Sequence, residues 1–357
     1  MAAMACCKGR AKMFFACGCS KHYFRTRLVA ACGDTQIWGV RVGCLPERAI
    51  PLDYFYVVAG LIGLFFGGEA LVRGSVGIAR RMAIPPLLIG LTVVGFGTST
   101  PELLVSVDAA LRGVPDIAVG NIVGSNIANI LLIVGLTALV WPITVMGATL
   151  RRDTLVMVAA ALALVPVFAL AQMGRISGAV LVLGLIGYLV WAYRTPGAAA
   201  EEDENLPAPS STWVSVLWVV GGLAILMLGA RFLVDGAVNI ARGYGISEAF
   251  IGLTIVAVGT SLPELATSLI AAVRRQSEIA IGNIVGSNIF NVLGILGITA
   301  VISPIPIAGR FLTFDLPVMI AASLVLTVLL LTRPKIGRIT GVALLVGYVV
   351  YVWAAQG

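Results

Sequence analysis

Long apolar segments separated by short polar ones run along the chain from about Asp53 to its end. About 20 apolar residues suffice for a helix to cross the hydrocarbon core. In lipid such segments are expected to be helical, because each must satisfy its own backbone polar groups. The pattern predicts an all-α polytopic membrane protein with ten transmembrane helices. The predicted spans are residues 54–76, 84–111, 117–140, 152–171, 176–193, 213–234, 246–273, 280–302, 312–332 and 338–355.

Composition and charge support a lipid bilayer as the main partner of this chain. Hydrophobic residues make up 59% of it and charged residues only 11%, against roughly a quarter charged in soluble proteins. The net charge of +7 does not indicate nucleic-acid binding, because all but one of these charges come from the first 50 residues. We expect no obligatory protein partner.

Residues 1–52 form a basic leader that contains all six cysteines and the single histidine, His22. The cysteines are Cys6, Cys7, Cys17, Cys19, Cys32 and Cys44. Their spacing matches no zinc-binding template, and no long apolar run marks a signal peptide. We expect this leader to be disordered or to reflect a mis-assigned start.

The rest of the chain contains one unit written twice. Residues 90–130 and 252–292 match without a gap, with 25 of 41 positions identical. The two predicted repeats cover residues 53–194 and 213–357, joined by an acidic linker at 195–212. Each repeat has five spans, an odd number, so the second must enter the membrane in the opposite sense. Two inverted five-helix repeats are typical of secondary transporters, with the site between them near the midplane.

Loop charges predict the orientation, since Lys and Arg are enriched in cytoplasmic loops. If the first span starts outside, ten basic residues lie in inner loops and four in outer loops. The inner residues are Arg80, Arg81, Arg151, Arg152, Arg194, Arg274, Arg275, Arg333, Lys335 and Arg338, and the outer ones Arg112, Arg175, Arg242 and Arg310. We therefore expect both termini outside the cytoplasm and a cytoplasmic linker.

The motifs GTSTPE and GTSLPE place Glu102 and Glu264 in the middle of the second and seventh spans. A carboxylate at the bilayer centre costs about 2.5–3.5 kcal/mol on insertion scales and indicates function. Two carboxylates at equivalent positions would repel each other unless a cation lay between them. Glu102 and Glu264 are therefore the predicted centre of an ion site.

A proline four residues after a glycine predicts a helix break in each motif. Pro101 has no amide to bond the carbonyl of Gly97, and Pro263 has none for Gly259. The freed carbonyls lie beside Thr98 and Thr260 as further oxygen ligands. Carboxylates, carbonyls and hydroxyls form a hard oxygen set suited to calcium and sodium.

The second element is GNIVGSN, followed by Asn129 in one repeat and Asn291 in the other. Ser125 and Asn129 are four residues apart and share a helix face, as do Ser287 and Asn291. Small-xxx-small glycine pairs allow close backbone approach; they are Gly120 with Gly124 and Gly282 with Gly286. The remaining asparagines are expected to hold the broken turn together; they are Asn121, Asn126, Asn283 and Asn288.

Simpler interpretations exist for each element alone. A GxxxG motif with Ser and Asn commonly mediates helix–helix packing alone, and a lone intramembrane Glu can be protonated and hydrogen-bonded. Both elements, present twice at one depth, favour an ion site. We interpret the pairs Glu69–Arg73 and Arg231–Asp235 as ion pairs without a transport role. Other acids near span ends are expected to be interfacial or capping groups: Asp108, Asp153 and Asp315.

These motifs resemble the paired repeats of the calcium:cation antiporter superfamily, most closely its prokaryotic sodium/calcium exchangers. The similarity runs from residue 53 to the end. It implies that calcium and sodium share the glutamate pair and that hydroxyls and asparagines complete the sites. The residues so implied are Thr98, Ser99, Glu102, Ser125, Asn129, Thr260, Ser261, Glu264, Ser287 and Asn291.

One position departs from the family, which often carries Asp where this chain has Asn291. In potassium-dependent relatives that carboxylate is tied to potassium, so potassium dependence is not expected. The resulting prediction is a sodium/calcium antiporter of a prokaryotic inner membrane that works by alternating access, without cofactor or enzymatic activity. A proton-coupled exchanger and, less favoured, a cation channel stay open. The membrane region has no histidine for a zinc protease or a Ser–His enzyme.

Overall fold

The computed structural model describes residues 36–37, 40–41, 50–82, 84–144, 148–195, 211–245 and 257–355. The chain divides into two units, residues 1–50 and 51–357. In the first, the described residues form an antiparallel pair of strands, β1 (Gln36–Ile37) and β2 (Val40–Arg41). The rest of the expected disordered leader, most of the linker and the start of the seventh predicted span lie outside the described residues.

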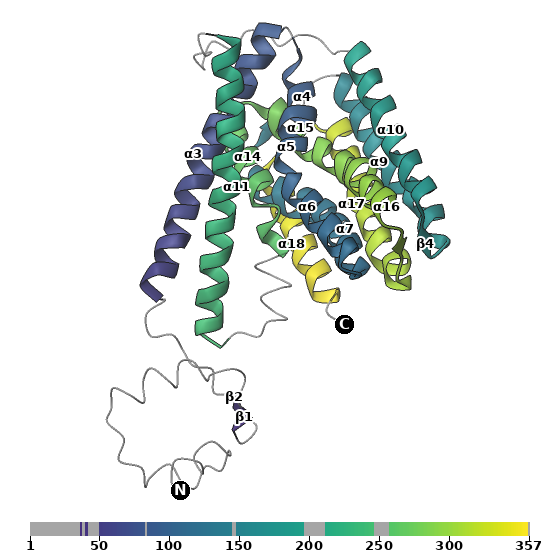
Figure 1. The fold of residues 1–357 in the computed structure, drawn as a ribbon. Helices are drawn as coiled ribbons and strands as arrows, with labels where there is room; N and C mark the ends of the chain where they lie inside the picture. Colours follow the sequence, from purple (N-terminus) through teal and green to yellow (C-terminus); the bar gives the residue numbers. More distant parts are fainter. Residues whose placement is uncertain are drawn as a thin grey trace, which may run out of the picture. The chain divides into compact units, whose positions relative to one another are not determined.

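Helices make up nearly all of the described part of the second unit (Figure 1). The first repeat contains α3 (Ile50–Met82), α4 (Pro86–Ile89), η2 (Gly90–Val94), α5 (Gly95–Thr98), α6 (Thr100–Leu111), α7 (Pro115–Ala128), η3 (Asn129–Ile133), α8 (Val134–Val140), β3 (Ile143–Thr144), α9 (Ala148–Ala169), β4 (Gln172–Met173) and α10 (Arg175–Arg194). The second contains α11 (Thr212–Gly243), α13 (Ala257–Gly259), α14 (Leu262–Val273), α15 (Ser277–Ile289), η5 (Phe290–Leu296), α16 (Gly297–Ile302), β5 (Ile305–Pro306), η6 (Phe311–Asp315), α17 (Leu316–Thr332), β6 (Lys335–Ile336) and α18 (Arg338–Ala354). The η segments are π-helical turns.

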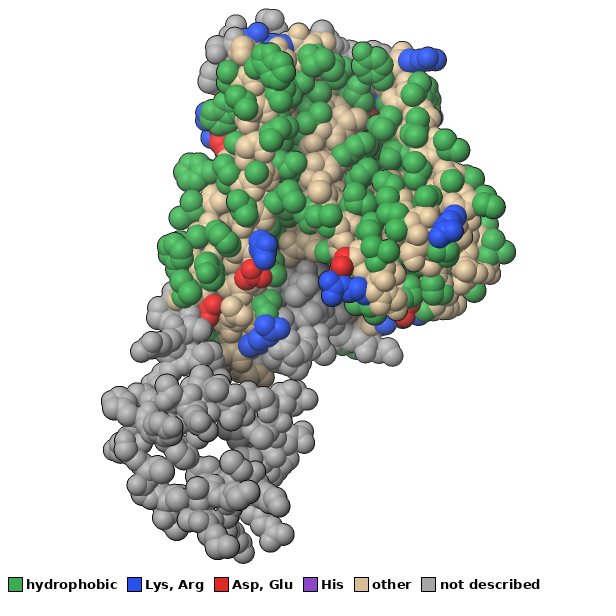
Figure 2. Space-filling view, in the orientation of Figure 1, with side chains coloured by type: hydrophobic (Ala, Val, Ile, Leu, Met, Phe, Trp, Pro, Cys, Tyr) green, Lys and Arg blue, Asp and Glu red, His purple; other side chains and the backbone are tan. Residues whose placement is uncertain are grey.

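Seven of the described helices are long and apolar enough to cross a membrane, and the bent pair Pro86–Thr98 and Thr100–Leu111 adds an eighth. Two shorter apolar helices, Leu262–Val273 and Arg338–Ala354, lie within the seventh and tenth predicted spans. Many large hydrophobic side chains are exposed, and on the face drawn in Figure 2 they cover much of the surface with few charged groups among them. The chain is thus an all-helical integral membrane protein, whereas the count of ten inverted spans stays a prediction.

Helices α3 and α11 lie side by side, and close backbone packing joins them (Figure 1). A Cβ atom at Gly67 would lie 2.6 Å from the Leu226 nitrogen, and one at Gly222 would lie 2.5 Å from the Leu71 nitrogen. Only glycine fits at such separations. The first spans of the two repeats therefore form an antiparallel pair through glycine.

Two short strand pairs connect the repeats. Strand β3 pairs with β6, and β4 pairs with β5, both antiparallel. In the sequence, β3 corresponds to β5 and β4 to β6, so each pair is the counterpart of the other. This exchange is what two similar halves related by a two-fold axis would produce.

The buried core of the second unit is built from helices of both repeats. Ile122 and Ile127 of α7 are fully buried in one cluster with Ile284 and Ile289 of α15. Helix α6 packs on α7, and α14 on α15, as two hairpins of the same kind. The motifs that carry the predicted ion ligands thus lie in the most buried part of the described structure.

Candidate ion-binding site

Each helix break falls on the serine of its GTS motif. Ser99 separates α5 from α6 with φ −83° and ψ 9°, and Ser261 precedes α14 with φ −91° and ψ 8°. The segments on either side of Ser99 meet at 44°. Pro101 and Pro263 lie in the first turns of α6 and α14, where a missing amide removes no helical hydrogen bond. The chain therefore breaks where the prolines predicted it.

The break turns both glutamates into first-turn residues. Glu102 lies at the start of α6 and Glu264 at the start of α14, and each side chain is only 1% exposed. Unpaired amides make a helix N-terminus electropositive, which favours a carboxylate there. The fold thus supports two buried acidic groups with two helix ends.

Serines of each repeat contact the glutamate of the other. The Ser99 hydroxyl donates to Glu264 Oε1 at 2.9 Å, and the Ser261 hydroxyl approaches Glu102 Oε1 at 3.5 Å. The second distance is the limit of a hydrogen bond, so the first contact is the stronger one. The exchange of partners brings the two predicted carboxylates to one site between the repeats.

Asparagines of the second element support the first turns that carry the glutamates. The Asn121 amide donates to the backbone oxygen of Glu102 at 3.1 Å and to Ser106 Oγ at 3.0 Å. In the other repeat, the Asn283 amide donates to the backbone oxygen of Glu264 at 3.2 Å and to Ser268 Oγ at 2.8 Å. This is the supporting role expected of the two asparagines.

Two serines that are not among the predicted ligands complete this support. Ser106 and Ser268 occupy equivalent repeat positions, four residues after their glutamates, and both are buried. Both are polar residues inside apolar spans, and the same residue type occurs at the equivalent position of the two repeats. That pattern is the sequence signal that would have identified them.

The other predicted ligands surround the same region. Thr98 donates to Asn283 Oδ1 at 3.1 Å, and Ser287 donates to the Gly95 oxygen at 3.2 Å. Asn129 and Asn291 are each 1% exposed. Asn129 begins η3, which packs on the Glu264 helix α14, and η5, which contains Asn291, packs on the Glu102 helix α6. Each asparagine therefore lies near the glutamate helix of the other repeat.

Four buried acceptor oxygens of this set have no hydrogen-bond partner. They are Oε2 of Glu102, Oε2 of Glu264, Oδ1 of Asn129 and Oδ1 of Asn291. Leaving a buried acceptor unsatisfied costs about 1–3 kcal/mol, and more for a charged group. A bound cation would satisfy all four with the hard oxygen ligands that calcium prefers.

The remaining predicted ligands, Ser125 and Thr260, line a cavity of about 520 Å³. The cavity extends past Asp116, at the start of α7, and Arg310 to Ala355, which follows α18. It connects the region of the site with one end of the helices. Within the described part of the chain, no group of three or more His, Cys, Asp or Glu residues forms an alternative metal site.

Charged residues outside the site form ion pairs, some more buried than expected. Glu69 binds Arg73 at 2.6 Å, as predicted, but also Arg274, the residue that follows α14, at 2.8 Å. Asp153 was expected to be interfacial or capping, but it is fully buried and pairs with Arg152 at 2.6 Å. Helix α9 packs closely on α17, and Asp153 lies inside the helix bundle and not at its surface.

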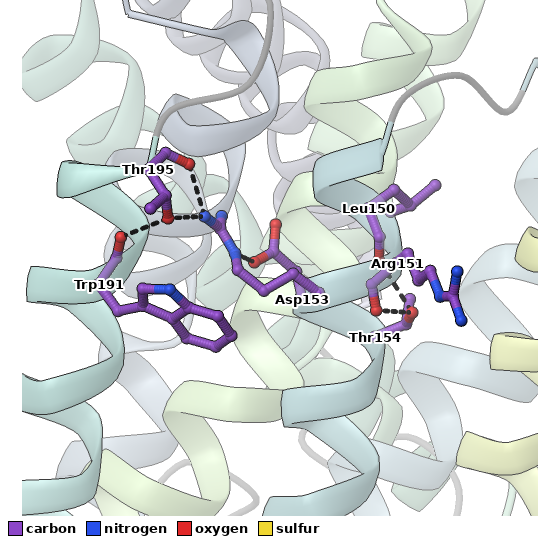
Figure 3. Close-up of polar contacts among 7 residues, drawn as sticks. Leu150, Arg151, Asp153, Thr154, Trp191 and Thr195 are labelled. Carbon is purple, nitrogen blue, oxygen red and sulfur yellow. Dashed lines mark hydrogen bonds and ion pairs between the residues drawn. The ribbon is translucent and has the colours of Figure 1, made fainter.

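The Arg152 guanidinium also joins two helices. It donates to the Thr195 oxygen at 2.8 Å and lies 5.5 Å from the centre of the Trp191 ring. Figure 3 shows Asp153 of α9 facing Trp191 and Thr195 at the end of α10. At the corresponding position of the second repeat, Asp315 accepts from Arg310 at 3.2 Å and from Tyr351 at 3.0 Å. These acids are structural.

The chain is similar over most of its length to the sodium/calcium exchanger family and to individual membrane proteins. The sequence model of the sodium/calcium exchanger protein family matches residues 52–194 and 214–356. The putative antiporter CaxA of Alkalimonas amylolytica is 41% identical over 306 residues, which cover 83% of this chain and 96% of CaxA. The inner membrane protein YrbG of Escherichia coli is 37% identical over 305 residues, covering 83% of this chain and 94% of YrbG.

A solved structure of the sodium–calcium exchanger NCX_Mj has the same fold. Its sequence identity to this chain is 36% and the TM-score is 0.74, over 85% of this chain and 98% of that one. The helical architecture, the duplicated motifs and these similarities all support the same family assignment. The chain belongs to the sodium/calcium exchanger family.

Proposed function

We propose that this protein exchanges Ca²⁺ for Na⁺ across the membrane by alternating access, with one ion site between two inverted five-helix repeats. The observation that carries the proposal is the set of four buried, unpartnered acceptor oxygens from Glu102, Glu264, Asn129 and Asn291. The fold kinship with NCX_Mj, described as a sodium–calcium exchanger, supports the same function. The ions are cargo, so no cofactor or enzymatic step is required.

Charge balance explains why the two ions compete. Glu102 and Glu264 together supply about two negative charges, which one Ca²⁺ or several Na⁺ at adjoining positions would neutralise. An empty site keeps two buried charges without a counter-ion, and burying unpaired charge carries a large desolvation penalty. The loaded core can therefore change between outward and inward openings, whereas the empty core is held back.

The other ligands complete the coordination that Ca²⁺ requires, which is six to eight oxygens. We assign this role to the hydroxyls and amides that the family resemblance implied: Thr98, Ser99, Ser125, Asn129, Thr260, Ser261, Ser287 and Asn291. The carbonyls freed by Pro101 and Pro263 add to the set. The crossed contacts Ser99–Glu264 and Ser261–Glu102 support shared sites over two separate ones.

The cavity beside Ser125 and Thr260 is the proposed access path in this conformation. Its mouth lies near Asp116 and Arg310, at the ends that the loop charges predict to be outside. This assignment makes the structure outward-facing. We further propose a prokaryotic inner membrane as its location, as for the relative named inner membrane protein YrbG, with both termini outside the cytoplasm.

The test is radioactive calcium uptake into proteoliposomes loaded with sodium and diluted into sodium-free buffer. Potassium-loaded vesicles are the control for gradient dependence. Uptake that requires the outward sodium gradient is the expected result. Uptake driven by a pH gradient instead would replace sodium by protons as the coupling ion. Absence of any gradient-driven calcium flux, with monodisperse protein, would overturn calcium as the substrate.

A further inference from the structure

Asn126 links the two repeats beside the ion site, a role that its position in the motif does not reveal. Its side chain is 3% exposed and lies in α7, next to Ser125. Its Oδ1 accepts a hydrogen bond from Asn291 Nδ2 at 2.9 Å. Its Nδ2 donates to the backbone oxygen of Asn288 at 3.3 Å and contacts the Met319 sulfur at 3.6 Å.

These two bonds define the orientation of both carboxamides. A carboxamide has one acceptor and one donor end, so turning it exchanges the two. Asn126 uses its donor end for the Asn288 backbone, which leaves its oxygen facing Asn291. Asn291 must then present its amide to Asn126, and its Oδ1 is directed elsewhere. That oxygen is buried and has no hydrogen-bond partner.

The corresponding residue of the other repeat does not do this. The Asn288 amide donates to Ile284 of its own helix at 2.9 Å. Neither Asn288 Oδ1 nor Asn129 Oδ1 accepts a hydrogen bond, so the side chains of Asn288 and Asn129 are not hydrogen-bonded to each other. Two residues with the same place in the motif therefore differ in what they orient.

We propose that Asn126 is a positioning residue for ion binding: it holds the Asn291 carboxamide with its oxygen available as a neutral ligand. The proposal rests on the proposed function. A carboxylate at the position of Asn291 would present two equivalent oxygens and would need no such orientation. An asparagine must be oriented to serve as a ligand, because its amide end would repel a cation. Asn126 supplies that orientation in this chain.

The test compares Asn126→Leu with Asn288→Leu, a matched change at the equivalent position. Without the Asn126 acceptor, we expect the calcium concentration for half-maximal uptake to rise about fivefold to tenfold, the scale of one hydrogen bond. The maximal rate should change less. Asn288→Leu should shift the half-saturation by less than about twofold. Equal shifts for the two variants would overturn the proposal.

A double-mutant cycle separates positioning from general destabilisation. If Asn126 acts through Asn291, adding Asn126→Leu to Asn291→Ala should not weaken calcium affinity further. Additive losses would show a merely structural role and contradict the proposal. Should Asn126→Leu not yield monodisperse protein, Asn126→Ala removes the same acceptor without added bulk and is compared with Asn288→Ala.

Calcium binding to the detergent-solubilised protein, measured by calorimetry, distinguishes this proposal from the function on which it rests. Binding that is weakened by Asn126→Leu but not by Asn288→Leu, in a protein without sodium-driven flux, would sink the exchange function and keep the positioning role. Sodium-driven flux with identical affinities in both variants would sink the positioning role alone.

Discussion

The two repeats are nearly identical around the glutamates and differ where they contact each other. Asn121 and Asn283 make matching bonds to a backbone oxygen and a serine of their own repeat. Asn126 and Asn288, which also match in sequence, bond differently: the first crosses to the other repeat, and the second stays in its own helix. Identical segments thus form the same local structure, but contacts between repeats depend on how the halves are placed.

The same contrast appears at the helix ends. Glu69 of α3 is 8% exposed and forms an ion pair with Arg274, which follows α14. The equivalent of Arg274 in the first repeat is Arg112, which instead pairs with Asp108 of the adjoining helix α6. Equivalent residues of the two repeats thus make different contacts at the helix ends. If the repeats are inverted and the proposed site opens at one end, this asymmetry is what distinguishes that end from the other.

The largest effect is expected from variants that test whether Glu102 and Glu264 contribute equally to the proposed site. Glu102→Gln and Glu264→Gln should each lower sodium-driven calcium uptake roughly 100-fold, since each removes half the charge of the site and a buried charged contact. Proteoliposome flux measures both. Asp108→Asn, on the Glu102 helix but with a 59% exposed side chain, is the control and should change flux less than about twofold. Loss in only one glutamate variant would contradict a shared site.

The matching asparagines offer the next test. Asn121→Ala and Asn283→Ala should each destabilise the protein by about 1–3 kcal/mol, because each removes two hydrogen bonds, one to a backbone oxygen and one to a serine hydroxyl. Asn283→Ala should cost more, since Asn283 is fully buried and also accepts from Thr98, whereas Asn121 is half-buried. Thermal unfolding in detergent measures the difference. A cost confined to Asn121 would show that the two turns are not equivalent.

The smallest effects concern the ion pairs. Glu69→Gln should destabilise the protein by about 1–2 kcal/mol, below the value for a fully buried pair because Arg73 and Arg274 are partly exposed. Asp235→Asn breaks the Arg231 pair in the corresponding part of α11. There both side chains are more than half exposed, so we expect at most about 0.5 kcal/mol. Equal melting temperatures for the two variants would remove this difference between the repeats.

The features that depend on composition and local order are predictable from the residues alone. Apolar length identified a helical membrane protein, because lipid leaves few alternatives to helices. The prolines of GTSTPE and GTSLPE predicted breaks that fall at Ser99 and Ser261. The duplicated Glu102 and Glu264 indicated an ion site, since a buried acid is too costly without a purpose.

The contacts between groups of the two repeats become visible only in the folded chain. No spacing rule relates Ser99 to Glu264, Asn126 to Asn291 or Glu69 to Arg274, which lie more than 160 residues apart. Asp153 likewise lies near a predicted span end in the sequence but is fully buried in the folded chain, where α9 packs on α17. Hydrogen bonds need partners within about 3.5 Å, and at that scale the packing of whole helices, rather than local sequence, selects the partner.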